Sequence, residues 1–234
     1  MAGYGTIGGV ALRKVVPTGS AASARDGRHT QFAVLMEPYS TKRIVKPGRM
    51  LFLEGDRSDF LFIVVSGCLR GYRMTVDGRR HIARFMTAGD VVALTSSKEH
   101  DYTAEAVSPT QILCCPRATV ERLMREDAAF REAIFERIDA ELAALRDQMV
   151  LLGQFSAEER AATFLSGLAA RNGGPEGEVH LPMTRRDIGD FLGLSFETVS
   201  RMFNDLKRKG IIEMTSPNRF RVSNPDELSA LAAA

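Results

Sequence analysis

Residues 184–210 (TRRDIGDFLGLSFETVSRMFNDLKRKG) are the stretch that most restricts how this chain can fold. They indicate two short amphipathic helices joined by a tight turn, because apolar residues recur three or four positions apart on both sides of Gly193. Thr184 with Asp187 forms a variant capping box, and Ser195 is a natural N-cap for the second helix. The pattern predicts a helix-turn-helix, a motif whose second helix enters the major groove of DNA.

The start of the second predicted helix carries three polar residues on one face. Glu197, Ser200 and Arg201 are three and four positions apart, so they share the side opposite the apolar residues. Arg can bond both guanine acceptors, Glu can accept from the cytosine amino group, and Ser can bond a base or a phosphate. The alternative is a helical hairpin with a solvated face, in which Glu197 and Arg201 form an ordinary i,i+4 ion pair.

Upstream, residues 39–116 contain short β-prone runs separated by glycine turns. Gly67, Gly78 and Gly89 are evenly spaced, and Asp77-Gly78 is a strong hairpin signal. Seven or more short strands with regular turns predict a closed or sandwiched β-roll. The expected strands are 50–53, 60–65, 69–74, 81–86, 91–94, 102–107 and 111–115.

Residues 117–152 change to a helical pattern with an apolar stripe. From Phe130 to Leu152 the stripe steps by 4, 4, 4, 3, 4 and 3 residues, close to a heptad repeat. This spacing predicts one long helix with a two-stranded coiled-coil seam, and the alternative is burial against the chain's own β-roll. We favour a homodimer, because a helix-turn-helix that reads a palindrome acts as a symmetric pair. The predicted interface consists of Ile134, Ile138, Leu142, Leu145, Met149 and Leu152.

Two further segments flank the helix-turn-helix. Residues 156–170 predict a helix that begins after Ser156 and ends before a Gly-Gly-Pro sequence. After Gly210, residues 211–214 and 219–222 predict a strand–turn–strand wing, which would bring Arg219 or Arg221 near the DNA backbone. A short helix is expected from Pro225 onward.

Composition indicates a globular protein of a reducing compartment. Of the 234 residues, 44% are hydrophobic and 26% charged, and no apolar run is as long as a membrane span. Three cysteines, Cys68, Cys114 and Cys115, are too few for a disulfide framework. The net charge is only +2, yet residues 184–221 hold eight Lys or Arg against five Asp or Glu. We therefore expect a cytoplasmic protein with no membrane partner and a local basic surface.

In this order of segments the chain resembles the CRP/FNR family of bacterial transcription regulators. The resemblance covers roughly residues 35–228 and is most specific at 192–201 (LGLSFETVSR), which has the Glu-x-x-Ser-Arg form of the FNR and FixK branch. The run 157–165 (AEERAATFL) also resembles the helix that begins the DNA-binding domain in that branch. The implied fold is α+β: a flexible tail (1–30), a jelly-roll or cyclic-nucleotide-binding-like β-roll (31–116), a dimerisation helix region (117–153) and a winged helix-turn-helix (154–234).

The resemblance also implies roles for single residues. Glu197 would contact the central half-site bases, Arg201 would read guanine, and Ser200 would distinguish this branch from the cyclic-AMP receptor type. Phe196 stands where that receptor uses Arg, so it would touch a thymine methyl or simply pack at the edge of the turn. The implied target is a palindrome with TTG at one end and CAA at the other, read by an activator that contacts RNA polymerase. Backbone contacts are expected from Thr184, Arg185, Ser195, Thr198, Lys207 and Arg219.

No bound cofactor is expected. Tyr102 falls where cyclic-nucleotide-binding relatives hold the phosphate with Arg, which argues against cyclic AMP. An iron–sulfur cluster of the FNR type needs four thiolates, and this chain has three cysteines with none before Cys68. The alternative is a redox or gas sensor, with a regulatory thiol among Cys68, Cys114 and Cys115 or haem held by His81 or His100. Buried structural cysteines on opposite strand faces are the commoner outcome for adjacent cysteines.

Other function classes find less support. A metal enzyme of the cupin type needs closely spaced histidines, whereas His29, His81, His100 and His180 are scattered. No Ser–His–Asp or Cys–His arrangement is visible. A third class is a module that binds a nucleotide without reading DNA, and the absence of the phosphate-binding Arg from this chain weighs against it. The sequence therefore predicts a regulator and not an enzyme.

Overall fold

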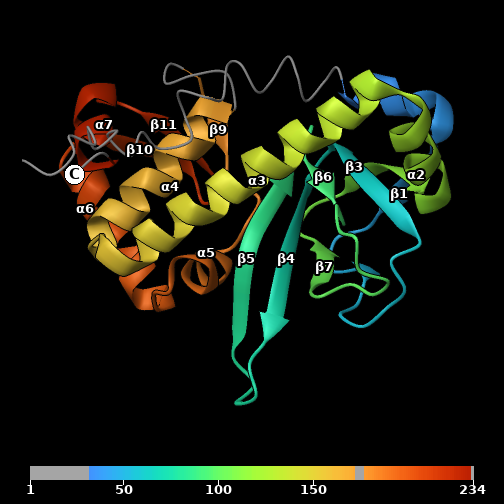
Figure 1. The fold of residues 1–234 in the computed structure, drawn as a ribbon. Helices are drawn as coiled ribbons and strands as arrows, with labels where there is room; N and C mark the ends of the chain where they lie inside the picture. The colour runs from blue at the N-terminus through green and yellow to red at the C-terminus, as the bar shows by residue number, and fades with distance from the viewer. Residues whose placement is uncertain (1–31, 172–176, 233–234) are drawn as a thin grey trace, which may run out of the picture.

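A computed structural model describes residues 32–171 and 177–232 of the protein. The flexible tail predicted at 1–30 lies outside the described residues. The fold has a β-roll, a long helix that crosses it, and a C-terminal lobe of helices and a small sheet (Figure 1). No helix within the described ranges combines the length and apolar character needed to cross a bilayer.

The β-roll consists of two four-stranded antiparallel sheets packed face to face. One sheet has the order β1 (Thr41–Val45), β8 (Thr110–Pro116), β3 (Phe60–Ser66) and β6 (Val91–Val92). The other has the order β2 (Met50–Phe52), β7 (Thr103–Ala106), β4 (Cys68–Met74) and β5 (Arg80–Thr87). Their inner faces meet in a core that includes Phe62, Val64, Leu69, Met86 and Ile112. The predicted β-roll is confirmed.

Strand β1 was not expected from the sequence. Its residues (TKRIV) include two basic side chains, and only Val45 is buried. It becomes a strand because its backbone pairs with β8, from Thr41 opposite Cys114 to Val45 opposite Thr110. A short 3-10 turn, η1 (Glu37–Tyr39), precedes it.

The stripe from Phe130 to Leu152 lies on one long helix as predicted, α3 (Ala128–Gln154), and a separate shorter helix, α2 (Arg117–Glu126), precedes it. Asp127 has an extended backbone, with φ −120° and ψ 110°, which interrupts the helical hydrogen bonding. Its carboxylate accepts hydrogen bonds from the backbone N–H groups of Ala129 and Phe130 at 2.9 and 3.0 Å. Asp127 is therefore the N-cap of α3.

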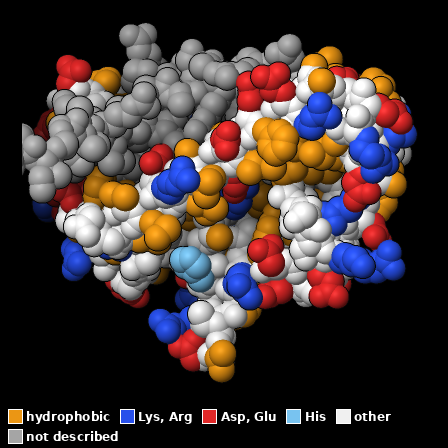
Figure 2. All heavy atoms as spheres, viewed as in Figure 1, with side chains coloured by type: hydrophobic (Ala, Val, Ile, Leu, Met, Phe, Trp, Pro, Cys, Tyr) orange, Lys and Arg blue, Asp and Glu red, His pale blue; other side chains and the backbone are white. Residues whose placement is uncertain are grey.

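The apolar stripe of α3 is shared between two environments. Phe130 and Ile134 are each 1% exposed and pack against the outer face of the roll. Ile134 belongs to the chain's own core, so its side chain is not accessible to a partner and its predicted place in the dimer interface is corrected. Farther along, Ile138, Leu142, Leu145 and Met149 are exposed in the single chain, and Leu152 is half-buried. Hydrophobic side chains gather along this helix in Figure 2.

The C-terminal lobe begins with α4 (Ala157–Arg171) and contains α5 (Arg185–Leu192), α6 (Phe196–Arg208) and α7 (Pro225–Ala232). The predicted wing is present as β10 (Ile212–Ser216) paired with β11 (Arg219–Val222). A third strand, β9 (Val179–His180), pairs with β11 and was not expected. The lobe core joins the helices and wing through Leu165, Ile188, Val199, Phe203 and Phe220.

We predict that Asp127→Ala destabilises the fold by about 1 kcal/mol, because two helix N–H groups lose their acceptor. Chemical denaturation followed by circular dichroism measures the change. Glu132→Ala, an exposed substitution in the second turn of α3, is the matched control and should be close to neutral. An unchanged midpoint in Asp127→Ala would show that the cap contributes nothing.

Candidate DNA-reading interface

Helix α5 is defined at both ends by its own sequence. Thr184 Oγ1 accepts the Asp187 backbone N–H at 3.1 Å, while Asp187 Oδ2 accepts the Thr184 backbone N–H at 3.0 Å. This is the expected capping box, with Asp in the position usually held by Glu. The helix ends at Gly193, whose φ of 66° lies in the left-handed region that favours glycine.

The turn between α5 and α6 allows no extra atom at Gly189. A Cβ at that position would lie 2.5 Å from the Leu194 carbonyl oxygen, well inside contact distance. Leu194 N–H also donates to the Gly189 carbonyl at 3.0 Å. A larger residue at Gly189 would therefore force the turn apart, and the hydrogen bond joins α5 to the residue before the N-cap of α6.

Helix α6 presents its polar face outward, as predicted. Ser195 is its N-cap, and its hydroxyl accepts the Thr198 N–H at 3.1 Å. Val199, Phe203 and Leu206 are buried against the lobe, so the opposite face is exposed to solvent.

Glu197 and Arg201 are exposed on that face, and Ser200 beside them is half-buried. The pKa of Glu197 is lowered by a hydrogen bond from its own backbone N–H, then by the Ser195 hydroxyl and the charge of Arg186. Glu197 is therefore an ionised acceptor. Arg201 makes no hydrogen bond or ion pair with any described residue, so the alternative Glu197–Arg201 pair is not formed.

Phe196 is 49% exposed at the first position of α6. Its ring is available for a contact outside the protein, since burial in the turn would have removed it from the surface.

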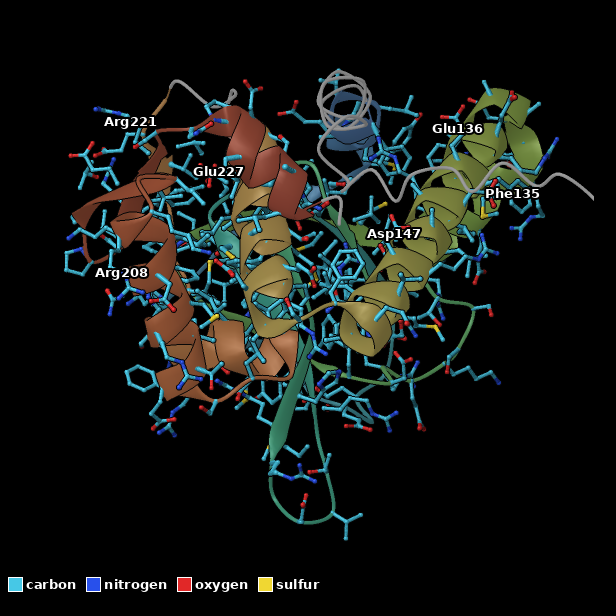
Figure 3. All side chains as sticks on the ribbon, turned by 90° about the vertical axis from the view of Figure 1, so that its left-hand side faces the viewer. Phe135, Glu136, Asp147, Arg208, Arg221 and Glu227 are labelled. Atoms are coloured by element: carbon cyan, nitrogen blue, oxygen red, sulfur yellow. The ribbon has the colours of Figure 1, made fainter. Side chains whose placement is uncertain are left out.

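The residues expected to contact the DNA backbone lie around α6, and they differ in exposure and in whether they already have a partner within the protein. The Arg185 guanidinium stacks on the Phe203 ring at 4.0 Å and is half-buried. Arg219, on the wing, pairs with Glu178 at 2.6 Å. Figure 3 shows Arg208, at the end of α6, and Arg221, on the wing, projecting on the side away from α3. The remaining positions, Thr184, Ser195 and Lys207, are exposed, and Thr198 is half-buried.

An ionic network attaches this lobe to the β-roll. Asp187 Oδ1 accepts hydrogen bonds from Arg70 Nη1 at 2.7 Å and from Arg80 Nη2 at 2.5 Å. Arg80 Nε also donates to Asp190 Oδ2 at 2.9 Å, and Arg70 forms a two-point pair with Glu105. Sequence reasoning assigned Asp187 only a capping role. The arginines lie more than 100 positions away, so no local pattern indicated them.

An aromatic contact and hydrogen bonds from side chains to backbone carbonyls complete the junction. Phe85 of β5 packs on Phe191 of α5, with ring centroids 5.4 Å apart. Arg160 of α4 donates to the carbonyls of Leu152, Phe155 and Leu192, while Gln148 of α3 donates to Phe191. The long helix, the roll and the helix-turn-helix therefore form a continuous packed body.

Comparisons with known proteins agree with this architecture. Residues 42–127 match the model of the cyclic nucleotide-binding domain, and residues 159–231 match that of the Crp-like helix-turn-helix domain. The nitrogen fixation regulation protein FixK of Bradyrhizobium diazoefficiens is 37% identical over 191 residues, 80% of each chain. The chain belongs to the CRP/FNR family. It is a FixK-like, DNA-binding transcription regulator and not an enzyme.

Other relatives lead to the same family. The fumarate and nitrate reduction regulatory protein of Salmonella typhi is 31% identical, over 82% of this chain and 78% of that protein. The solved structure of FixK2 from Bradyrhizobium japonicum superposes with a TM-score of 0.79 at 34% identity, covering 83% of this chain and 98% of that one.

In this FixK-like regulator Tyr102 is half-buried and packs against the core of the roll. A Cβ placed on Gly71 would lie 3.0 Å from Tyr102 Cε2, so the ring rests directly on the glycine backbone. Phe52 meets the same ring edge-on at 5.3 Å, and burial raises the pKa of the phenol. The side chain that replaces the expected phosphate-binding Arg thus occupies core space.

The two histidines considered for the haem alternative, His81 and His100, lie in different environments. His81 is exposed on β5, whereas His100 is buried with its ring stacked on Phe52 at 3.6 Å. Burial lowers the pKa of His100. No cluster of three or more His, Cys, Asp or Glu that could hold a metal occurs among the described residues.

All three thiols are buried and unpaired with one another. Cys114 faces the roll interior and Cys115 faces α2 and α3, so the expected opposite orientation is confirmed. Burial raises the pKa of Cys114 and of Cys115, and raises that of Cys68 to about 12, with the charges of Asp90 and Asp187 adding to the shift. Such thiols are poor nucleophiles.

We predict that the native thiols react slowly with a disulfide reagent at pH 8 and that all three react at once in denaturant. A pKa raised from 9.0 to about 12 lowers the thiolate fraction of Cys68 about 1000-fold, because the thiolate form is lost tenfold per unit. Absorbance of the released thiol measures the rates. Rapid native labelling of any single cysteine would favour the redox-sensor alternative.

Proposed function

We propose that this protein is a homodimeric transcription activator that reads a palindrome with TTG at one end and CAA at the other. The observation that carries the proposal is the outward face of α6, where Arg201 has no partner among the described residues and lies beside ionised Glu197. An unpaired guanidinium is ready to bond guanine O6 and N7, and the carboxylate can accept from the cytosine amino group. Both contacts fit a G·C pair within each half-site.

The exposed part of the α3 stripe supports a dimer. Leu142, Leu145 and Met149 are 43, 46 and 74% exposed, and they follow one another by three and four residues. Apolar side chains at such spacing bury one another across a two-stranded seam. A symmetric pair of reading helices also matches the symmetry of a palindrome.

The absence of a bound effector is part of the proposal. The Tyr102 ring packs on Gly71, and the Arg84 guanidinium on β5 pairs directly with Glu141 on α3. This ion pair joins the roll to the long helix through the chain's own side chains, which supports a regulator that works without cyclic AMP, an iron–sulfur cluster or haem. The protein would act in the cytoplasm.

Activation through RNA polymerase rests on the relatives. The transcriptional activatory protein AadR of Rhodopseudomonas palustris is 36% identical over 80% of each chain. Its name describes an activator, and we extend that role to this chain. In vitro transcription from a promoter with an upstream palindrome tests it, and repression there would contradict it.

We predict that Arg201→Ala loses preference for the TTG palindrome, at about 1–3 kcal/mol per half-site, because the two-point bond to guanine is removed. The preference is measured by fluorescence anisotropy with two duplexes, the palindrome and a version in which the guanine of each TTG is replaced by another base. Arg208→Ala, at the exposed far end of the same helix, is the control and should keep the wild-type preference. Equal discrimination by Arg201→Ala and wild type would refute the assignment.

We predict that Leu142→Glu with Leu145→Glu yields a monomer on size-exclusion chromatography with light scattering, because charges at the seam repel and cannot be buried. The matched control replaces both residues by Met, which preserves apolar volume and should preserve the dimer. If the doubly charged variant stays dimeric, the partner lies elsewhere on the surface.

A further inference from the structure

The carboxylate of Asp187 links the DNA-reading helices to the β-roll. Its Oδ2 accepts from the Thr184 backbone N–H and hydroxyl, and its Oδ1 accepts from Arg70 and Arg80. The side chain is only 1% exposed. One carboxylate therefore ends the first helix of the motif and joins it to two strands of the roll, using all its acceptor sites.

The two arginines are themselves firmly held. Arg70 on β4 bonds Glu105 of β7 through Nε and Nη2 at 3.3 and 2.6 Å. Arg80 on β5 stacks against the Tyr72 ring and adds Asp190, one turn along α5 from Asp187. The guanidinium side chains are 17 and 20% exposed, so water competes weakly for these bonds. A planar guanidinium with several donors fixes direction as well as distance.

Helix α6 must follow wherever this network places α5. The Leu194 N–H donates to the Gly189 carbonyl at 3.0 Å, and Ile188, Val199 and Phe203 of the two helices are buried in one core. Strands β4 and β5 belong to the roll, which also packs on α3, the proposed dimer seam. Packed and hydrogen-bonded contacts therefore connect α3, the roll and α6 without interruption. In a dimer, such a connection would set the distance and angle between the two reading helices.

We propose that Arg70 and Arg80 are positioning residues for DNA reading, and that they set the half-site spacing the dimer accepts. The inference rests on the proposed function, since it needs a dimer that reads two half-sites. The two arginines would leave base recognition by each single helix untouched. Their effect would be to exclude palindromes whose half-sites lie at another separation.

The test uses three DNA duplexes: the palindrome, the same palindrome with one base pair inserted at its centre, and a single half-site. One inserted pair moves a half-site by about 3.4 Å and turns it by about 35°. Fluorescence anisotropy at low salt, where weak half-site binding is measurable, gives the three affinities. Wild type is expected to prefer the correctly spaced palindrome about tenfold or more.

In Arg80→Gln this preference for correct spacing should fall by roughly 2- to 30-fold, while affinity for the single half-site is unchanged. Arg80→Lys should restore part of the preference, because a charge remains but the fork that bonds both Asp187 and Asp190 is lost. Arg73→Gln, whose partner Glu54 is an exposed residue of the roll, is the matched control and should behave as wild type. Thermal melting and size-exclusion chromatography confirm that each variant is a folded dimer.

The outcomes distinguish a failure of the positioning role from a failure of the proposed DNA-reading function. An unchanged spacing preference in Arg80→Gln overturns the positioning role, and so does a loss of half-site affinity, which would mean that the network merely keeps the reading helices folded. If wild type itself shows no preference for the TTG palindrome over scrambled DNA, the proposed function fails and the inference falls with it.

Discussion

A buried carboxylate, that of Asp187, is the point on which the relation between the two halves of this protein depends. A charge removed from water is tolerated only when it is fully paired, and here two guanidinium groups and the helix-capping donors satisfy it. Because those donors come from both the β-roll and the helix-turn-helix, neither half can turn away without leaving a buried charge unpaired. The interaction thus acts less as a source of stability than as a fixed orientation.

Around this point, apolar packing supplies most of the cohesion. Phe85, Phe164 and Phe191 form a cluster at the junction of β5, α4 and α5, and Cys68 of the roll is buried in the same core as the C-terminal lobe. The Cys68 side chain thus packs where the roll meets the lobe. Within the roll, the Tyr102 ring packs directly on the Gly71 backbone.

Local patterns were sufficient for the elements with regular periodicity and for the turns. The capping box at Thr184, the N-cap at Ser195 and the left-handed Gly193 are short-range features, and the structure contains each of them. Local sequence patterns did not predict strand β1 or the helix break at Asp127, and each has a physical reason. The first gains its conformation from pairing with β8, and the second from one side chain that interrupts an otherwise continuous helical pattern.

The sequence by itself determined the order of the segments, the helix-turn-helix and the outward position of Glu197 and Arg201, because helical periodicity assigns faces without knowledge of neighbours. Only the tertiary structure decided that Ile134 packs inside its own chain while Leu142 and Leu145 stay exposed. It alone brought Arg70 and Arg80 to Asp187. Contacts between residues more than 100 positions apart depend on how the roll and the lobe are docked, and no local spacing contains that information.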